Sequence, residues 1–284
     1  MNSQDLRYGA LHKKRKWTVV SMFGMALAIL FAVICIAPFI YMMLMSFTQS
    51  TTAMFRLNEI HFQDLSNYQY VFHNNGFFRS LLNSILVTGC SCFFNCVIAS
   101  MAAYGFEKKE FPGKEKLYQL YLATMMIPGQ VTMIPIFLIM KSMHLLNTYF
   151  ALIVLILNAF GVILIRQFMK GVPDDLLEAA QVDGCPEFQI YLKVVLPLIR
   201  PVLVSLVIFT FVTSWNDFMW PLISTSKSSM YTLTVALSLL KTQYATNYGL
   251  LMAGSAVSFV FPFVLYIFLQ KQFVEGIALS GIKG

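Results

Sequence analysis

The chain has 284 residues, of which 58% are hydrophobic and 12% are charged, and its mean hydropathy is +0.69. Soluble domains carry roughly 25% charged residues, so this composition excludes a soluble globular protein and indicates one embedded in a membrane. The net charge of +7 is better explained by membrane topology than by nucleic-acid binding, so no nucleic-acid partner is expected.

Six apolar runs are long enough to cross the hydrocarbon layer as helices, which takes roughly 20 residues. They lie near 19–46, 82–105, 117–140, 149–168, 198–222 and 247–270. The first run follows a basic stretch at 13–16, is too long for a signal-peptide core and has no clear cleavage site. We therefore expect an all-α integral membrane protein with six transmembrane helices, built as a single domain over 1–284.

The distribution of Lys and Arg predicts the orientation of these spans. If the amino terminus is cytoplasmic, fifteen of the 20 basic residues lie in inner segments, as expected for the cytoplasmic side of a membrane protein. Both termini are then cytoplasmic, with a basic amino-terminal segment at 1–18 and a tail at 271–284. The segment 169–197, between spans four and five, becomes a cytoplasmic loop.

The third span contains Pro128, Gly129 and Pro135 within the expected hydrocarbon region. Proline removes a backbone hydrogen bond that neighbours or water must replace, so we expect a kinked helix. One interpretation is a kink needed only for packing. The other is a bend that lines a solute path, with Gln130 facing that path.

No catalytic or metal site is expected. The five cysteines form no disulfide framework. Of those in the second span, Cys92 and Cys96 share a helical face while Cys90 points elsewhere, and no histidine is near them. The sequence contains no GxxxxGK[ST], HExxH or GxSxG motif. We expect no cofactor bound by this chain.

The loop between spans four and five has its own pattern. Pro173 at a first helical position, acids in the next turn and Gly184 at the end predict a short amphipathic helix. A second helix begins at Pro186, has apolar residues at i, i+3, i+4 and i+7, and ends or bends at Pro197. Those apolar residues are Phe188, Tyr191, Leu192 and Val195.

This loop holds five of the thirteen acidic residues, although an anionic cytoplasmic leaflet would repel them. They are Asp174, Asp175, Glu178, Asp183 and Glu187. An acidic helix pair with an apolar face favours docking on a protein partner. The alternative is a solvated connector that lies against its own bundle.

The stretch Glu178–Ala179–Ala180, then Gly184 after three residues, and Val194 to Pro197 after nine more, resembles the EAA loop of permeases in binding-protein-dependent ABC importers. Val194 stands where isoleucine is usual in that family. The stretches MIPGQVTMIPIF, SWNDFMWPLI, YTLTVAL, YGLLMAG and GIALSGIKG are similar to the carbohydrate-importer branch, in particular to its shorter, maltose-permease-like subunit.

The resemblance implies a sugar importer of a bacterial or archaeal plasma membrane. It implies a second permease subunit as partner, two ABC ATPase subunits that bind ATP and Mg, and an extracytoplasmic solute-binding protein. It also implies that the loop couples the permease to the ATPases. The coupling residues would be Glu178, Ala179, Ala180, Asp183, Gly184, Phe188, Leu196 and Pro197.

Polar residues inside apolar spans are candidates for the solute path, because an unpaired polar group in lipid is unfavourable. Asn158 in span four and Thr213, Ser214 and Asn216 in span five meet this condition. For Asn158, an interhelical hydrogen bond is the alternative.

A second group of candidates lies toward the expected outer interface. Trp215, Asn216 and Asp217 together offer stacking and hydrogen bonding to a sugar. The alternative is an aromatic interface residue with a nearby acid.

An ion-coupled secondary transporter is the main competing interpretation, since six spans and broken helices fit it too. Such transporters usually couple through ionisable residues near the membrane midplane. Here Arg166 and Asp217 lie near span ends, which disfavours that mechanism. A structural scaffold would explain the acidic loop but not the polar residues of spans four and five.

Overall fold

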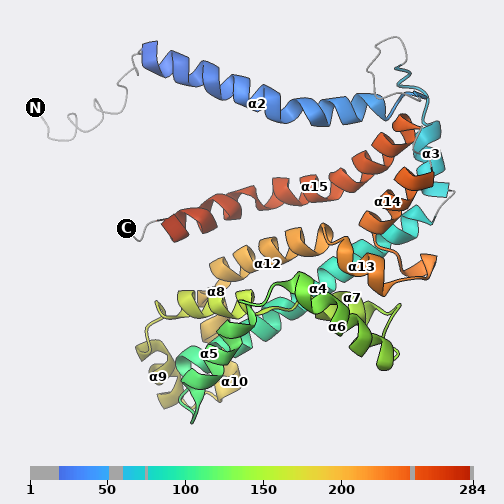
Figure 1. The fold of residues 1–284 in the computed structure, drawn as a ribbon. Coiled ribbons are helices and arrows are strands. Elements are labelled where there is room, and N and C mark those ends of the chain that lie inside the picture. The colour runs from blue at the N-terminus through green and yellow to red at the C-terminus, as the bar shows by residue number, and fades with distance from the viewer. Residues whose placement is uncertain (1–18, 51–59, 74–75, 244–246, 282–284) are drawn as a thin grey trace, which may run out of the picture.

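The structure is a computed structural model that describes residues 19–50, 60–73, 76–243 and 247–281. All regular secondary structure within these residues is helical (Figure 1). The expected all-α fold is therefore confirmed for the described part of the chain. The expected basic segment at 1–18 lies outside the described residues.

Three helices among the described residues are individually long and apolar enough to cross a membrane. They are α2 (Val19–Met45), α4 (Phe77–Lys108) and α15 (Tyr248–Gly281). They match the first, second and sixth expected spans. Helix α4 begins five residues before the expected start, directly after Gly76, whose φ of 63° is a left-handed conformation that favours glycine.

The third expected span is broken rather than gently kinked. Helices α5 (Lys114–Thr124) and α6 (Gly129–Ser142) meet at 98°. The break lies at Pro128 and Gly129, as expected, whereas Pro135 lies inside α6 and the helix continues through it. Pro135 therefore does not produce the bend that the sequence predicts for this group of residues.

The fourth expected span is divided into α7 (Tyr149–Val154) and α8 (Ala159–Met169). The fifth corresponds to α12 (Arg200–Trp215), which is followed by α13 (Met219–Ser224). If each pair with a sharp bend is taken as one span, the described residues contain up to five spans. The count of six stays a prediction, because α7 and α8 are too short individually.

Short helices connect the long ones. They are α3 (Ser66–His73), α9 (Asp175–Val182), α10 (Glu187–Ile190), the π-helical turn η2 (Tyr191–Val195), α11 (Leu196–Leu198), the 3-10 turn η3 (Ser228–Met230) and α14 (Leu233–Gln243).

Helix α4 is the centre of the bundle, where it packs against α8 and α12 (Figure 1). At Gly161 of α8 an added Cβ would lie only 3.0 Å from Ala99 Cβ and 3.1 Å from Leu206 Cδ1. The three helices are therefore close together at this glycine. Interfaces between membrane helices commonly use small residues in this way.

The described residues form four apolar clusters, of which two lie on either side of the breaks in the spans. The loop-end core is centred on Ala103, Ile165, Val195 and Ile199, all fully buried, and joins α4, α8, α12 and the loop helices. The far-end core consists of Met140, Ala151 and Trp220 and joins α6, α7 and α13. The breaks in the third, fourth and fifth spans lie between these two cores.

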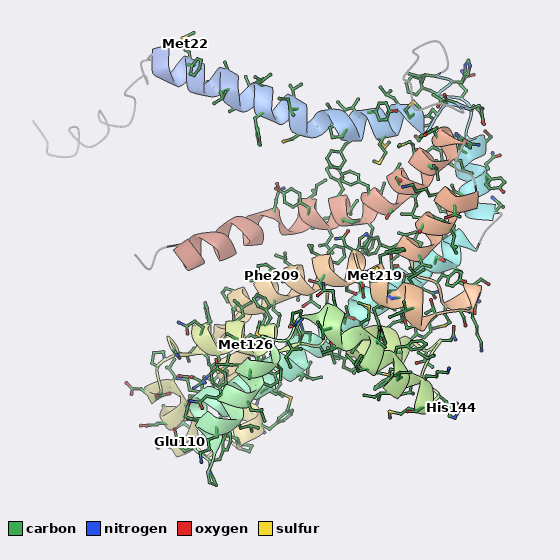
Figure 2. The ribbon with its side chains drawn as sticks, viewed as in Figure 1. Met22, Glu110, Met126, His144, Phe209 and Met219 are labelled. Atoms are coloured by element: carbon green, nitrogen blue, oxygen red, sulfur yellow. The ribbon has the colours of Figure 1, made fainter. Side chains whose placement is uncertain are left out.

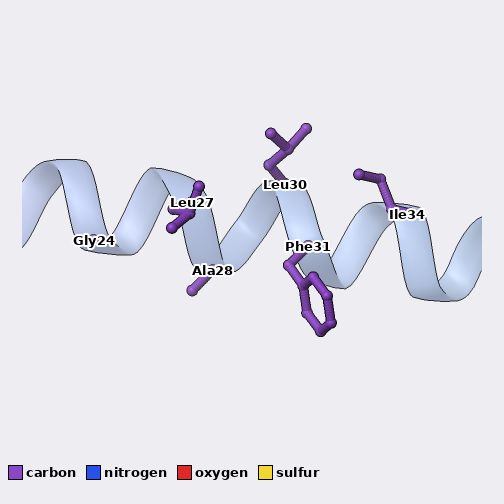
Figure 3. A pocket seen from close by; sticks show the side chains of 6 residues that line it. All are labelled: Gly24, Leu27, Ala28, Leu30, Phe31 and Ile34. Carbon is purple, nitrogen blue, oxygen red and sulfur yellow. The ribbon is translucent and has the colours of Figure 1, made fainter.

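Helix α2 stands apart from the bundle (Figures 1 and 2). None of its most apolar window is buried within this chain. A shallow hollow on this single helix is lined only by apolar residues and glycine, as Figure 3 shows. Its lining is Gly24, Leu27, Ala28, Leu30, Phe31 and Ile34. The hollow has no polar side chain with which to bind a sugar.

Candidate functional site

The loop between spans four and five forms two short helices joined at Gly184, as the sequence predicts. Gly184 has a φ of +76°, and the Cys185 amide donates to the Ala180 carbonyl at 3.0 Å. A left-handed residue at this position satisfies carbonyls at the end of a helix and favours glycine, which has no Cβ. The local backbone therefore requires this residue.

The helix ends differ in two places from the sequence-based expectation. Helix α9 begins at Asp175, with Asp174 as its N-cap, so Pro173 precedes the helix instead of occupying its first position. The second bend, of 77°, falls between Leu198 and Arg200. Pro197 lies in the first turn of α11, where its missing N–H is tolerated, and so it does not end the helix.

The apolar residues of the loop divide between two faces. Tyr191 and Val195 are buried in the loop-end core, whereas the side chains of Phe188 and Leu192 are 62% and 43% exposed. Val182 of α9 is 88% exposed. The sequence pattern had placed Phe188, Tyr191, Leu192 and Val195 on one face. The π-helical turn at Tyr191–Val195 alters that register.

The acidic residues divide in the same way. Asp174 pairs with Lys108 at 2.7 Å and Glu187 pairs with Lys109 at 2.6 Å, so these two acids attach the loop to α4. Among the described residues, Asp175, Glu178 and Asp183 have no ion-pair partner. All three side chains are exposed.

Most of the expected coupling residues lie on the exposed surface of the loop. Glu178, Ala179, Asp183, Gly184, Phe188 and Pro197 are exposed, and Ala180 and Leu196 are partly buried against the loop-end core. Together with Val182 they form the outer loop face, which combines unpaired carboxylates with large apolar side chains. A surface of this composition is typical of a protein-binding site.

The candidate solute-path residues do not form one group. Asn158 caps α8 by accepting a hydrogen bond from the Phe160 amide at 3.0 Å, so the expected interhelical bond is absent among the contacts of the described residues. It lines a small pocket of about 20 Å³ together with Thr213. Gln130 is exposed at the start of α6 and is not part of that pocket lining.

Two further polar residues of this pocket are Asn95 of α4 and Thr210 of α12. Asn95 Nδ2 donates to Thr210 Oγ1 at 2.9 Å. Neither Asn95 nor Thr210 is among the candidates from the sequence, although Thr210 lies within the expected fifth span. An asparagine in the middle of the second apolar run is the signal that identifies Asn95.

The remaining candidates serve packing. Ser214 is buried and donates to Thr88 Oγ1 at 3.2 Å, which joins α12 to α4. The Trp215 ring is 4% exposed and stacks on Phe261 at 4.8 Å and on Phe211 at 5.6 Å between ring centroids. The ring therefore has no free face for a sugar, and the expected stacking role for Trp215 is not supported.

The two polar residues after Trp215 interact with nearby backbone. Asn216 Nδ2 donates to the Val212 carbonyl at 2.8 Å, within its own helix end. The Asp217 carboxylate accepts from the Trp220 amide at 3.4 Å. The structure therefore brings Asn158 and Thr213 to one pocket but does not bring Trp215, Asn216 and Asp217 together around a shared space.

Comparison with known proteins identifies a family and several relatives. The family described as binding-protein-dependent transport system inner membrane component matches residues 95–277. The arabinooligosaccharides transport system permease protein AraQ of Halalkalibacterium halodurans is 33% identical over 278 residues, which cover 95% of this chain and 100% of the relative. The lactose transport system permease protein LacG of Rhizobium radiobacter is 32% identical over 71% of this chain and 74% of the relative.

Among solved structures, a bacterial ABC transporter involved in the import of the acidic polysaccharide alginate has a similar fold. The TM-score is 0.76 at 24% sequence identity, and the match covers 95% of this chain and 98% of that chain.

Proposed function

Because the chain belongs to the family of binding-protein-dependent transport system inner membrane components, we propose that it is a permease subunit of an ATP-driven oligosaccharide importer. The observation that carries this proposal is the match to that family over most of the chain. Relatives are named for arabinooligosaccharides, lactose and diacetylchitobiose, which supports a sugar of two or more units as the solute.

In this proposal the chain crosses a bacterial or archaeal plasma membrane six times, with both termini in the cytoplasm. The excess of Lys and Arg in the expected inner segments supports this orientation. Residues 1–284 act as one permease domain and form half of the translocation path. A second permease subunit supplies the other half, and Asn95, Asn158, Thr210 and Thr213 contribute polar groups to the path.

A separate solute-binding protein delivers the sugar on the outer side. A solved relative of similar fold is described as a complex with an alginate pentasaccharide-bound periplasmic protein, which supports this type of partner. On the inner side two ATPase subunits bind ATP and Mg, since this chain has no phosphate-binding loop motif. The permease itself carries out no catalysis.

The outer loop face is the proposed docking surface for an ATPase. Exposed Phe188 and Val182 supply apolar contact area, while Glu178 and Asp183 supply charges that basic residues of a partner can bind. When the ATPases close around ATP, they move this loop. The loop then moves the spans between inward-open and outward-open arrangements.

The test is recovery of partners with the tagged chain from native membranes in mild detergent, followed by mass spectrometry. The wild-type chain should recover an ATPase with a phosphate-binding loop and a second permease. Glu178→Arg combined with Gly184→Trp should lose the ATPase and keep the permease, because both changes lie on the outer loop face and none lies in a span.

Gly113→Trp is the matched control. Gly113 also has a positive φ, of 83°, and no atom lies within 4 Å of an added Cβ at either glycine. The control therefore introduces the same backbone strain and the same bulk in another connecting segment. Loss of the ATPase in this control as well would contradict docking through the outer loop face. Failure of the wild type to recover any ATPase would overturn the proposed function itself.

A further inference from the structure

The charged residues at the end of α4, and Lys109 directly after it, connect three segments of the chain. Glu107 pairs with Arg166 of α8 at 2.9 Å, Lys108 pairs with Asp174 before α9 at 2.7 Å, and Lys109 pairs with Glu187 of α10 at 2.6 Å. Lys109 follows the helix in an extended conformation, with φ of −121° and ψ of 145°, so the three side chains leave the end of α4 in different directions and reach three neighbours. We call this group of charged residues the α4 node.

Arg166 is a largely buried charged residue of the node, with 11% of its side chain exposed, and in the node only Lys108, at 5%, has a more buried side chain. Arg166 Nη2 also contacts Glu115 of α5 at 3.3 Å, and its guanidinium lies 3.8 Å from the Tyr118 ring centroid. One side chain therefore holds α4, α5 and α8 together. A planar guanidinium can bind two carboxylates and stack on a ring at once, whereas lysine cannot.

The loop-end core supports the node from inside. Tyr191 of the loop contacts Ser100 of α4 through a 2.7 Å hydroxyl contact, and its ring lies 5.6 Å from the Tyr104 ring. Phe106 of α4 lies 5.4 Å from the ring of Tyr118 in α5. The loop, α5, α8 and the end of α4 are therefore joined by both charge pairs and apolar contacts.

Helices α5 and α8 are each joined, across a break, to a helix that packs in the far-end core. Helix α6 follows α5 across the break at Pro128, and α7 precedes α8 across the break before Asn158, yet both pack in the far-end core. The node therefore gathers only the loop-side halves of these spans. A displacement of the loop would reach α4, α5 and α8 together. Beyond the breaks, α7 packs on α4 through Leu152 and Val87, so movement of the node reaches the far half of that span through α4.

We propose that Arg166, paired with Glu107 and Glu115, is a positioning residue that makes the loop and the loop-side halves of the spans move as one unit during ATP-driven transport. This inference rests on the proposed function. Without Arg166 the loop would still receive movement from an ATPase but would transmit it to the spans incompletely. ATP hydrolysis would then continue with less sugar moved.

The test measures sugar uptake and ATP hydrolysis in the same vesicles, using the complete complex and its solute-binding protein. Arg166→Gln should still recover the ATPase but should lower the sugar moved per ATP on the order of tenfold, within the range typical of coupling between distant sites. Arg166→Lys should fall between this variant and the wild type, because lysine keeps the charge but cannot bridge both carboxylates.

Glu110→Gln is the matched control, because it breaks the 2.8 Å pair with Lys114 within one short stretch of chain and leaves the Lys114 bond to the Lys109 carbonyl in place. The Glu110 carboxylate is 91% exposed, and exposed pairs of this kind contribute little. The sugar moved per ATP should be unchanged in this control.

Glu115→Gln covers the case in which Arg166→Gln does not assemble. Glu115 is 63% exposed, and its loss leaves the Arg166–Glu107 pair in place. This variant should assemble and move less sugar per ATP than the wild type. An unchanged ratio in Arg166→Lys and Glu115→Gln, with a coupled wild type, would overturn the inference and leave the proposed function standing.

Discussion

At the scale of single residues, Glu187 is held by Tyr104 of α4 and by Lys109, the residue directly after α4. Glu187 lies in the loop 169–197, outside the expected spans, where Lys109 pairs with its carboxylate and the Tyr104 hydroxyl donates to it. The hydrogen bond from Lys109, followed by that from Tyr104, lowers the pKa of Glu187 from its ordinary value of 4.5. Both interactions favour the ionised form.

This environment predicts a pH-dependent contribution of Glu187 to stability. Because the folded-state pKa is lowered, the contribution is fully present above pH 4.5 and is lost as the pH falls through the folded-state value. Glu187→Gln should therefore lower the melting temperature of the solubilised complex at neutral pH. The difference from the wild type should shrink toward about pH 4. A constant difference at both pH values would contradict this assignment.

The stacked Trp215 predicts a defect in stability rather than in sugar binding. Its ring stacks on Phe211 and Phe261, whose centroids are 6.0 Å apart, in one aromatic cluster. Trp215→Ala therefore removes a large buried side chain and should cost about 3–5 kcal/mol of stability. Thermal unfolding in detergent checks the loss, and the KM for sugar should remain that of the wild type. Asn216→Ala, which removes only a bond within its own helix end, is the control. A raised KM with normal stability in Trp215→Ala would restore the sugar-contact role.

At the scale of helices, the breaks in three spans divide the bundle into units with separate cores. Helices α6, α7 and α13 pack on one another, and their partners α5, α8 and α12 contribute to the loop-end core. A continuous helix could not serve both cores across the 98° bend between α5 and α6. The broken helices therefore permit relative movement that straight spans would resist.

Joining α5 to α6 should impair transport. Proline is about 3 kcal/mol and glycine about 1 kcal/mol less favourable than alanine inside a helix, so Pro128→Ala with Gly129→Ala favours continuation through the break. Uptake should fall while the ATPase is still recovered. Pro135→Ala is the control, because α6 already continues through Pro135 and should not change direction. Equal uptake in the double variant and this control would contradict the hinge.

At the scale of the whole molecule, hydrophobic runs predicted where helices occur, and helix breakers predicted one break, at Pro128 and Gly129, but not the break in the fourth run. The first, second and sixth runs coincide with α2, α4 and α15, because these runs have no clustered helix breakers at their centres. Helix α15 continues to Gly281, eleven residues past the expected end of the sixth run at 270. The fourth run has no proline, yet the chain leaves the helix before Asn158, which caps the next one. The break is set by the Asn158 cap and by helix packing, and neither can be predicted from the apolar pattern alone.

The parts of the candidate site that depend on residues close together in the sequence could be predicted, and the parts that depend on distant residues could not. The hinge at Gly184 follows from the residues around it. The α4 node does not, since Arg166 meets Glu107 and Glu115 across 59 and 51 positions of chain. In the sequence, the basic residues are explained by membrane topology. The position of Arg166 at the end of an apolar run is the one sign that it forms a buried ion pair. The stacking of Trp215 on Phe261 could not be predicted either, because these two residues also lie far apart in the sequence.

Helix α2 is held by parts of the chain that are synthesised after it. Phe39 lies 4.6 Å from Phe259 between ring centroids, and an added Cβ at Gly249 would meet the Thr48 carbonyl at 1.9 Å. Helix α2 therefore gains these contacts only after α15 has been made. A nascent chain that stops before α15 leaves α2 without them, so synthesis of α15 is the step that joins α2 to this part of the subunit.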